Sequence, residues 1–399
     1  MSQRYQFNRL EFAGALGDLG SLIPIAMAMI LVNGISPVGI FFSVAIAYLA
    51  SGLYYGVTVP IQPMKIIAAY AIATGMNSDQ IFASCLLMAI LLLIIALSNS
   101  IKYIKKYTPY VIICGVQFTT GVLLMLGGLD FILGYSPFQT LQQSAEPYLQ
   151  IQTIGPLATG IVIAAFAFVT TLIFLKSRKY PAGLILILGG AVGGYLLGAR
   201  PQLELENLGW HFPEIMSFPF PGQIDFSLAL FALVIPQLPM TMGNAVLAYS
   251  DLSKKYFANK SEKVTEKNCC LSMAVANIFS FIFGGIPICH GAGGLAAHYQ
   301  FGARSAGANI IIGSILLLLT LLLGENIVAL FYLLPMAILG VLLIFAGWQL
   351  VLTIRTLSNK IDFLIILCML FITLASNLAW GFILGLLLVV LHKTFIKYP

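Results

Sequence analysis

The chain has 399 residues, of which 60% are hydrophobic and only 9% are charged, and its mean hydropathy is +0.98. Soluble proteins carry roughly 25% charged residues, so 20 basic and 14 acidic side chains could not cover a soluble surface of this size. The composition excludes the soluble classes and indicates an integral membrane protein. The net charge of +6 does not indicate a nucleic-acid partner, because the basic residues fall at the ends of apolar runs.

Long apolar runs follow one another along the whole chain. A hydrocarbon core about 30 Å thick needs roughly 20 apolar helical residues, and this criterion predicts an all-α polytopic membrane protein with 14 transmembrane segments. The runs are centred near residues 22, 46, 68, 88, 118, 163, 190, 235, 275, 296, 313, 342, 369 and 387. The first contains acidic residues and no small-residue cleavage site, so it is read as a span rather than a signal peptide. The third and tenth are short and rich in Gly and Pro, which predicts broken helices.

The basic residues predict an orientation, because they favour the cytoplasmic ends of spans. With the N-terminus inside, Arg200 falls outside, Lys65 falls within the membrane, and the other eighteen are cytoplasmic. These are Arg4, Arg9, Lys102, Lys105, Lys106, Lys176, Arg178, Lys179, Lys254, Lys255, Lys260, Lys263, Lys267, Arg304, Arg355, Lys360, Lys393 and Lys397. We therefore expect a multi-pass protein of the cell (plasma or inner) membrane with both termini in the cytoplasm.

The two halves of the sequence carry matching motifs at an offset of about 227 residues. The pairs are Val59-Pro60-Ile61-Gln62-Pro63 with Ile286-Pro287-Ile288-Cys289-His290, Glu11 and Gly17-Asp18 with Gln237 and Gly243-Asn244, and Pro109 and Gly115-Val116 with Pro335 and Gly340-Val341. Seven spans per copy is an odd number, so the second copy is expected upside down in the membrane. Residues 1–200 and 225–399 are thus predicted to form two inverted seven-span repeats, a plan of many secondary transporters.

In each copy a short extended segment with a central proline precedes a half-helix. We expect these half-helices to run from Pro63 towards Gly75 and from His290 towards Gly302. Inversion brings both N-termini to one point near the midplane, where free N–H groups and about half a positive charge favour an anion. The predicted substrate-binding residues are Gln62, Pro63, Met64, Lys65, Gln237, Asn244, Cys289, His290, Gly291 and Ala292.

Lys65 is the most informative of these residues. A cation at mid-membrane costs roughly 2.5–3.5 kcal/mol on insertion scales, and the first turn of a half-helix disfavours positive charge as well. Both effects indicate an anion beside Lys65. That anion is either the substrate or a permanent partner, for which Asp18 and Glu11 are the available carboxylates.

Glu11 and Asp18 are seven residues apart and are expected on one face of a single first helix. Asp18, deeper in the span and flanked by glycines, is predicted to serve in proton coupling or in hydrogen bonding at the site. Glu11 either shares that role or is solvated at the interface. The repeat mates Gln237 and Asn244 keep the hydrogen bonding without the charge, so proton chemistry is expected mainly in the first copy.

Neither a metal nor a cofactor is expected. Cys289 and His290 supply two ligands where zinc usually takes four, and His298 is expected to pack in the interior. The stretch Gly291–Gly294 lacks the GK[ST] ending of a P-loop. The six cysteines lack paired CxxC spacing.

The motifs resemble the molybdate transporter family, a branch related to the sulfate permeases. The resemblance is carried by Gly14–Gly20, Pro60–Lys65, Pro236–Pro239 with Gly243-Asn244, and Pro287–Gly294. It implies a core domain from residues 1–97 and 225–323 and a gate domain from residues 98–200 and 324–399. No segment like the C-terminal cytoplasmic domain of sulfate permeases follows the last span, which favours the molybdate branch.

The resemblance implies a secondary active transporter that imports a tetrahedral oxyanion, molybdate above all, by alternating access with proton coupling. Sulfate or tungstate is the first alternative substrate, and a nucleobase or bicarbonate is the next. A membrane-embedded enzyme is a further alternative, but it would need a nucleophile–base pair or a metal cluster, and the sequence shows only isolated histidines. A passive channel is the remaining alternative. The expected partners are the oxyanion, a co-transported proton, the lipid bilayer and, in a homodimer, a second copy of the chain.

Overall fold

The structure, a computed structural model, describes residues 4–98, 100–101, 109–175, 177, 180–200 and 209–395. Some basic residues that predict the orientation lie outside this part: Lys102, Lys105, Lys106, Lys176, Arg178, Lys179, Lys397 and the side chain of Lys393. Within the described residues, seven helical segments are long and apolar enough to cross a membrane, and four shorter apolar helices accompany them. The chain is a multi-pass helical membrane protein.

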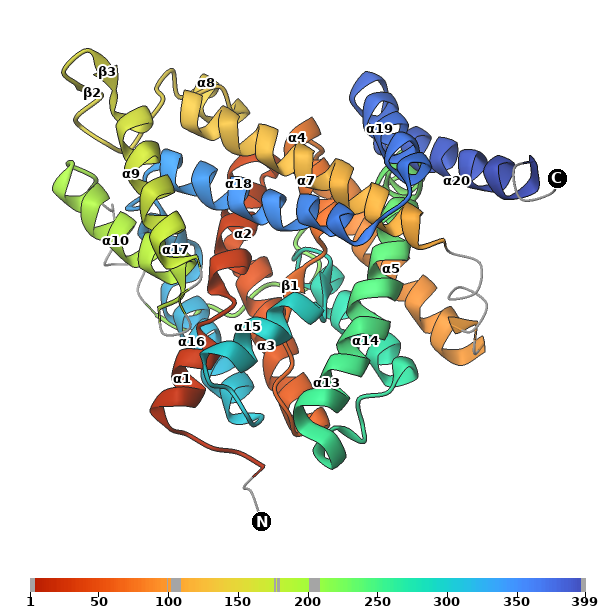
Figure 1. Cartoon of the computed structure of the whole chain (residues 1–399). Coiled ribbons are helices and arrows are strands. Elements are labelled where there is room, and N and C mark those ends of the chain that lie inside the picture. The colour runs from red at the N-terminus through yellow and green to blue at the C-terminus, as the bar shows by residue number, and fades with distance from the viewer. Residues whose placement is uncertain are drawn as a thin grey trace.

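The first half of the chain begins with helices that pack around a short strand (Figure 1). Its elements are α1 (Arg9–Ala15), α2 (Leu19–Asn33), α3 (Pro37–Tyr55), β1 (Gln62–Pro63), α4 (Lys65–Thr74), α5 (Ser78–Ser98), α7 (Tyr110–Leu133), α8 (Pro137–Leu141), the hairpin β2 (Thr153–Ile154) and β3 (Leu157–Ala158), α9 (Thr159–Phe174) and α10 (Ala182–Leu196).

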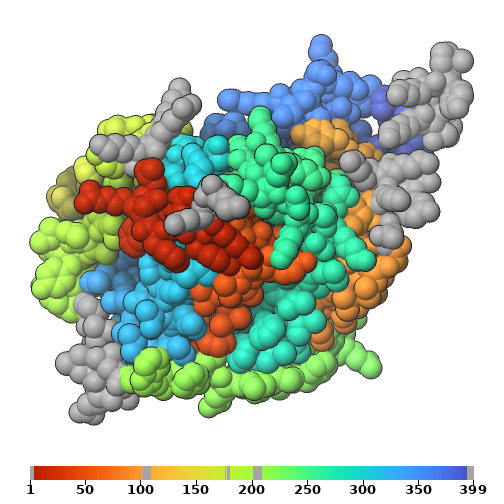
Figure 2. All heavy atoms as spheres, turned by 90° about the horizontal axis from the view of Figure 1, so that it is seen from below, coloured from red at the N-terminus to blue at the C-terminus, as the bar shows by residue number. Residues whose placement is uncertain are grey.

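The second half repeats this pattern of long helices around a short strand. Its elements are α11 (Gln223–Leu228), the π-helical η2 (Ala229–Val234), α12 (Ile235–Met240), the π-helical η3 (Thr241–Ala248), α13 (Tyr249–Phe257), η4 (Ala258–Ser261), α14 (Glu266–Ile282), β4 (Ile288–Cys289), α15 (Ala292–Phe301), α16 (Gly307–Leu323), η5 (Gly324–Asn326), α17 (Ile327–Phe331), α18 (Met336–Val351), η6 (Leu352–Thr356), α19 (Lys360–Ala375) and α20 (Leu378–Phe395). Segments from both halves alternate on one face of the molecule, so the halves are interleaved (Figure 2).

The first span is broken, and the expectation of one continuous helix there is wrong. Helix α1 ends at Ala15 and α2 begins at Leu19, and the turn between them contains Gly17 and Asp18. Glycine is among the weakest helix formers, and the Asp18 carboxylate bonds to other side chains instead of capping α2. Glu11 and Asp18 therefore belong to two helices and do not share a face.

The two predicted half-helices are present, but each begins two residues later than expected. Helix α4 begins at Lys65 and α15 at Ala292, because the residues before them are held in a strand pair. Strands β1 and β4 pair antiparallel, with Gln62 opposite Cys289. Both helices end where the sequence predicts, at glycines in the left-handed conformation, Gly75 and Gly302.

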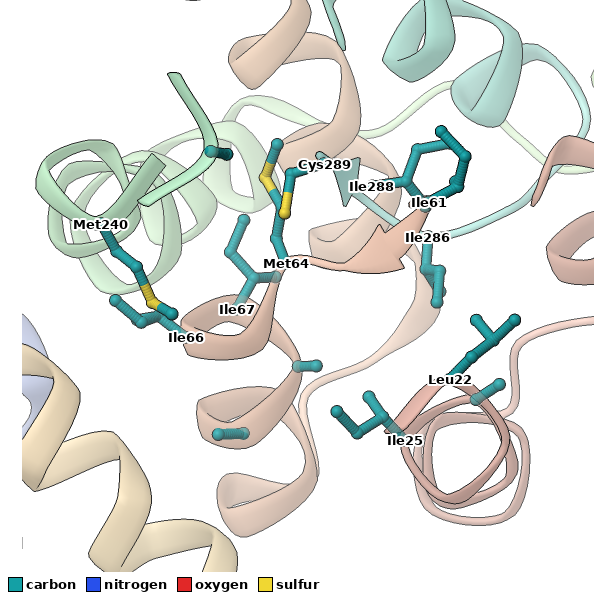
Figure 3. Close-up of a cluster of buried hydrophobic side chains, with 14 of the residues drawn as sticks. Leu22, Ile25, Ile61, Met64, Ile66, Ile67, Met240, Ile286, Ile288 and Cys289 are labelled. Atoms are coloured by element: carbon teal, nitrogen blue, oxygen red, sulfur yellow. The ribbon is translucent and has the colours of Figure 1, made fainter. Parts of the chain in front are cut away.

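An apolar cluster surrounds the strand pair and fixes it in the interior. Met64 lies beside Cys289, and Leu22 and Ile25 of α2 lie on another side of the pair (Figure 3). Met64 is fully buried and Cys289 is 7% exposed. Extended backbone at this depth is tolerated because protein covers it.

Helices α7 and α18 lie side by side (Figure 1) and approach at glycine pairs. A Cβ on Gly121 would collide with the carbonyl oxygen of Gly347, and the converse collision is equally close. Gly128 and Gly340 form a second reciprocal pair. Small residues allow such close backbone approach between helices in membranes.

Glu146, in the loop after α8, caps the N-terminus of α18. Its carboxylate accepts hydrogen bonds from the N–H groups of Met336 (2.8 Å) and Ala337 (2.9 Å). The side chain is 2% exposed, and this burial raises the pKa of Glu146 from 4.5 to about 7 against the effect of the two hydrogen bonds.

We expect Glu146 to make the protein less stable as the pH rises from about 5 to 7. In that range the folded state holds a proton that the unfolded state has lost, so stability falls with pH by up to about 1.4 kcal/mol per unit. Glu146→Gln should flatten this slope in thermal unfolding of the purified protein at pH 5–8. The control is Glu214→Gln at an exposed carboxylate. An unchanged slope in Glu146→Gln would assign the pH dependence to other groups.

Candidate functional site

A cavity of about 300 Å³ lies where the break between α1 and α2 meets the start of α4 and of α15. Helices α9, α10 and α18 form its other side. Its polar lining residues are Asp18, Ser21, Gln62, Lys65, Thr171, Ser177, Gln300 and Gln349. The volume is at the lower end of the range for small-molecule sites.

Asp18, Ser21 and Gln62 form a hydrogen-bonded cluster on the cavity wall. Gln62 Nε2 donates to Asp18 Oδ1 (2.5 Å) and to Ser21 Oγ (3.0 Å), and Ser21 Oγ donates to Asp18 Oδ1 (2.6 Å). Asp18 is buried, with 4% of its surface exposed. Among the described residues, its Oδ2 atom nevertheless has no hydrogen-bond partner. A buried carboxylate oxygen without a partner is costly, so this atom is suited to bind a proton or a ligand donor.

Positive charge and free backbone donors face the same cavity. Lys65, the first residue of α4, lines it and is half-buried. Ala292, Gly293 and Gly294 are the first residues of α15, whose N–H groups have no acceptor within the helix. Gly293 lines the cavity, and a Cβ built there would meet no atom within 4 Å. An anion in the cavity would thus meet a lysine and a helix N-terminus.

The N-terminus of α4 has a neutral cap. Gln237 Oε1 accepts hydrogen bonds from the N–H groups of Ile66 (3.1 Å) and Ile67 (3.3 Å). Its Nε2 donates to Thr241 Oγ1 (2.9 Å), and the side chain is 1% exposed. Gln237 lies on α12 between two π-helical stretches, and π-helical turns occur frequently at functional sites. Gln237 positions α4 and does not line the cavity.

His290 also has partners away from the cavity. Its Nε2 is 2.7 Å from Ser272 Oγ on α14, and its Nδ1 is 3.4 Å from the carbonyl oxygen of Pro60. Ser272 Oγ is in turn 2.8 Å from the hydroxyl of Tyr55. His290 is 1% exposed and links the start of α15 to α14 and α3. His298 is buried as expected, with its Nδ1 2.8 Å from Thr58 Oγ1.

The remaining predicted residues do not line the cavity and pack next to residues that do. Pro63, Met64 and Cys289 are buried in or beside the strand pair. Gly291 packs so closely on Gln62 that a Cβ would collide with its amide oxygen, and Asn244 Nδ2 lies 3.8 Å from the same position. Ala292 is half-buried.

Glu11 lies away from the cavity lining, and its Oε1 accepts a hydrogen bond from the N–H of Arg304 (2.9 Å).

The structure therefore brings Asp18, Gln62 and Lys65 together at one cavity. Sequence reasoning missed several polar residues that line it, among them Ser21, Thr171 and Gln349. Ser21 follows Asp18 by about one helical turn, and Gln349 is an isolated amide in an apolar run. Both positions could have been recognised from the sequence as candidates for the site. Thr171 could not, because threonine is common in membrane helices.

Residues 10–124 and 229–350 match the family described as "Molybdate transporter of MFS superfamily". The chain belongs to this molybdate transporter family. Among its relatives, Molybdate transporter 2 of Arabidopsis thaliana is 28% identical over 413 residues, which cover 96% of this chain and 87% of that protein. Molybdate transporter 1 of Chlamydomonas reinhardtii is 27% identical, with coverage of 94% and 90%. The family resemblance expected from the motifs is confirmed.

The fold of this molybdate transporter family member is shared with solved anion transporters. The transmembrane domain of a cyanobacterium bicarbonate transporter, BicA, superposes with a TM-score of 0.64 at 17% identity, covering 96% of this chain and 98% of that domain. Murine Solute Carrier 26 family member A9, an anion transporter in the inward-facing state, gives 0.67 at 15% identity, covering 98% and 70%. Family and fold together support an anion transporter and not an enzyme.

Proposed function

We propose that the chain is a secondary active transporter that imports a tetrahedral oxyanion, with molybdate as its substrate, by alternating access. The observation that carries the proposal is the cavity where Lys65 and the first turn of α15 meet the unpartnered oxygen of Asp18. A lysine and free amides suit an oxyanion. Both relatives compared above bear the name molybdate transporter, which favours molybdate over other oxyanions.

Uptake into proteoliposomes tests this proposal directly. We expect labelled molybdate to accumulate under an inward proton gradient, and excess tungstate or sulfate to compete more strongly than bicarbonate or uracil. Bicarbonate belongs in the panel because the BicA domain shares the fold. Uptake of bicarbonate or uracil without molybdate uptake would overturn the substrate assignment. Rapid flux without accumulation would indicate a channel.

Gly293→Val should weaken molybdate binding, because its side chain would enter the open space at the N-terminus of α15. Displacing one hydrogen bond to a charged ligand costs about 1.5–3 kcal/mol, so we expect an affinity loss of about tenfold or more. Equilibrium binding to purified protein measures it. Gly189→Val on α10 is the matched control, since it also meets open space but lines a separate apolar hollow. Equal affinities in the two variants would place the anion elsewhere.

We propose that the cavity lies between a core domain (residues 1–97 and 225–323) and a gate domain (residues 98–200 and 324–399). Asp18, Lys65 and Gly293 belong to the core, and Thr171 and Gln349 belong to the gate. The cavity reaches Phe174, Ser177 and Gln300, near segments expected in the cytoplasm. This favours an inward-facing state, the state named for the murine anion transporter.

We also propose that the chain contains fourteen spans in two inverted repeats. Antiparallel pairing of β1 with β4 supports this, because Gln62 lies opposite Cys289, its mate at an offset of 227 residues. The reciprocal contact of Gly121 with Gly347 gives a second pair, at an offset of 226. Residues related by a two-fold axis meet their own mates only on that axis, so both pairs are expected near it.

A further inference from the structure

An apolar groove of about 380 Å³ lies between α3 and α14, apart from the cavity described above. Its walls include Ala47, Ala50 and Tyr54 of α3 and Ser272 and Phe279 of α14. Leu53 next to the groove (56% exposed) and Val275 in its lining (52% exposed) both face outward. The groove is thus open at a surface that lipid would cover in a membrane.

The length of the groove matches one leaflet of a bilayer. On α3 it extends from Ile46 to Tyr54, and on α14 from Asn268 to Phe279. At a rise of about 1.5 Å per residue these stretches are roughly 12 Å and 17 Å long, close to half of a hydrocarbon core of about 30 Å. An acyl chain from a single leaflet fits this length, whereas a spanning helix of another protein would extend beyond it.

Basic side chains gather at the end of the groove that contains Tyr54 and Asn268. Lys263 Nζ lies 5.3 Å from the centroid of the Tyr54 ring, and Arg4 donates a hydrogen bond to the carbonyl oxygen of Leu53. The segment 251–267 carries five lysines against three acidic residues. The groove therefore has an apolar body and a positively charged end, which complements an anionic lipid.

The floor of the groove connects to the start of α15. Ser272 lines the groove, and its hydroxyl contacts His290 Nε2 (2.7 Å) and the hydroxyl of Tyr55 (2.8 Å). His290 lies two residues before α15, whose first turn faces the cavity. An occupant of the groove would therefore touch a hydrogen-bond chain that ends at this half-helix.

We propose that the groove between α3 and α14 binds an anionic phospholipid, with an acyl chain along the groove and its phosphate beside Lys263 and Arg4. Juxtamembrane basic residues attract anionic lipids of the cytoplasmic leaflet, and this end of the groove is the one we expect in the cytoplasm. The site depends on the fold and the charges and does not require that the substrate be molybdate.

Native mass spectrometry of the full-length protein tests the site with phosphatidylglycerol and phosphatidylcholine of identical acyl chains. We expect tighter binding of phosphatidylglycerol, about fivefold weaker binding in Lys263→Gln, and loss of it in Ala50→Trp, which fills the groove. The controls are Lys360→Gln, at the exposed first residue of α19, and Ala165→Trp, at an exposed alanine on α9. Both should bind as the wild type does.

Three outcomes would overturn the proposal. One is equal binding of the two lipids by the wild type. Another is unchanged phosphatidylglycerol binding in an Ala50→Trp protein with wild-type thermal stability. The third is a change of Ala50→Trp from dimer to monomer with lipid binding retained, which would assign the groove to a second copy of the chain. Because Ala50→Trp could disturb packing, Lys263→Gln at an exposed residue provides an independent test.

Discussion

Replacing Lys65 with alanine is expected to lower molybdate affinity by at least about 30-fold. Truncating one member of a buried, hydrogen-bonded charge pair costs roughly 2–5 kcal/mol, which corresponds to a factor between about 30 and several thousand. Lys65 supplies a positively charged side chain to the cavity lining. The N-terminus of α4 is capped by Gln237, so its free N–H groups do not replace that charge. Lys65→Arg should restore the charge but bind less well than the wild type, because a planar fork of donors differs from a point charge.

Equilibrium binding and thermal unfolding of each variant separate a lost contact from a lost fold. Lys254→Ala, at an exposed lysine on α13, is the control and should bind as the wild type does. If Lys65→Ala binds molybdate with wild-type affinity, Lys65 is not a substrate ligand, and its charge instead serves to balance Asp18. If the variant unfolds at a much lower temperature and molybdate restores its stability, the site survives without Lys65.

The elements nearest the site were the most predictable part of the fold. Proline disfavours helix at the strand pair, and glycine allows the left-handed residue that ends each half-helix at Gly75 and Gly302. These are local constraints that a sequence displays directly. The break at Gly17 and Asp18 was missed because a hydrophobic run of this length looks continuous, and the break depends on side-chain bonds to Gln62.

The directions in which side chains point could not be predicted in the same way. His290 was expected to donate to an anion because it lies at the start of a half-helix, but its ring is bound by Ser272 on α14. Gln237 was expected at the substrate, but its amide caps α4 through Ile66 and Ile67. Both partners come from elements distant in sequence, and the choice among them is made by tertiary packing.

These two assignments concentrate the predicted chemistry in the first half of the chain. Asp18, Gln62 and Lys65 all lie in residues 1–97. The second half contributes the backbone of α15, the neutral cap Gln237 and two uncharged amides that line the cavity, Gln300 and Gln349. Among the residues that the structure describes, Asp18 is the one carboxylate that lines the cavity. Asp18 is therefore the residue at which proton coupling can be tested.

Asp18→Asn is expected to abolish accumulation of molybdate driven by an imposed pH gradient. Moving a dianion against a negative-inside potential costs about 2.3 kcal/mol per charge per 100 mV. Co-transport of more than two protons, or an equivalent cation flux, would make import electrically favourable. Asp18 Oδ2, buried without a hydrogen-bond partner among the described residues, would hold one of these protons, and the other charges would be carried elsewhere. Asparagine can still accept from Gln62 and Ser21 at the position of Oδ1, so the variant keeps the cluster while losing the titration.

The experiment compares two fluxes in the same proteoliposomes. Gradient-driven accumulation should fall to background in Asp18→Asn, while exchange of internal for external molybdate at equal pH should continue, because exchange needs no net proton movement. Glu11→Gln is the matched control: Glu11 is also a buried carboxylate of the first span, but it bonds to the Arg304 backbone and does not line the cavity. We expect it to accumulate molybdate normally. If Asp18→Asn accumulates molybdate with the gradient and Glu11→Gln does not, the coupling proton binds at the contact between α1 and Arg304, outside the cavity.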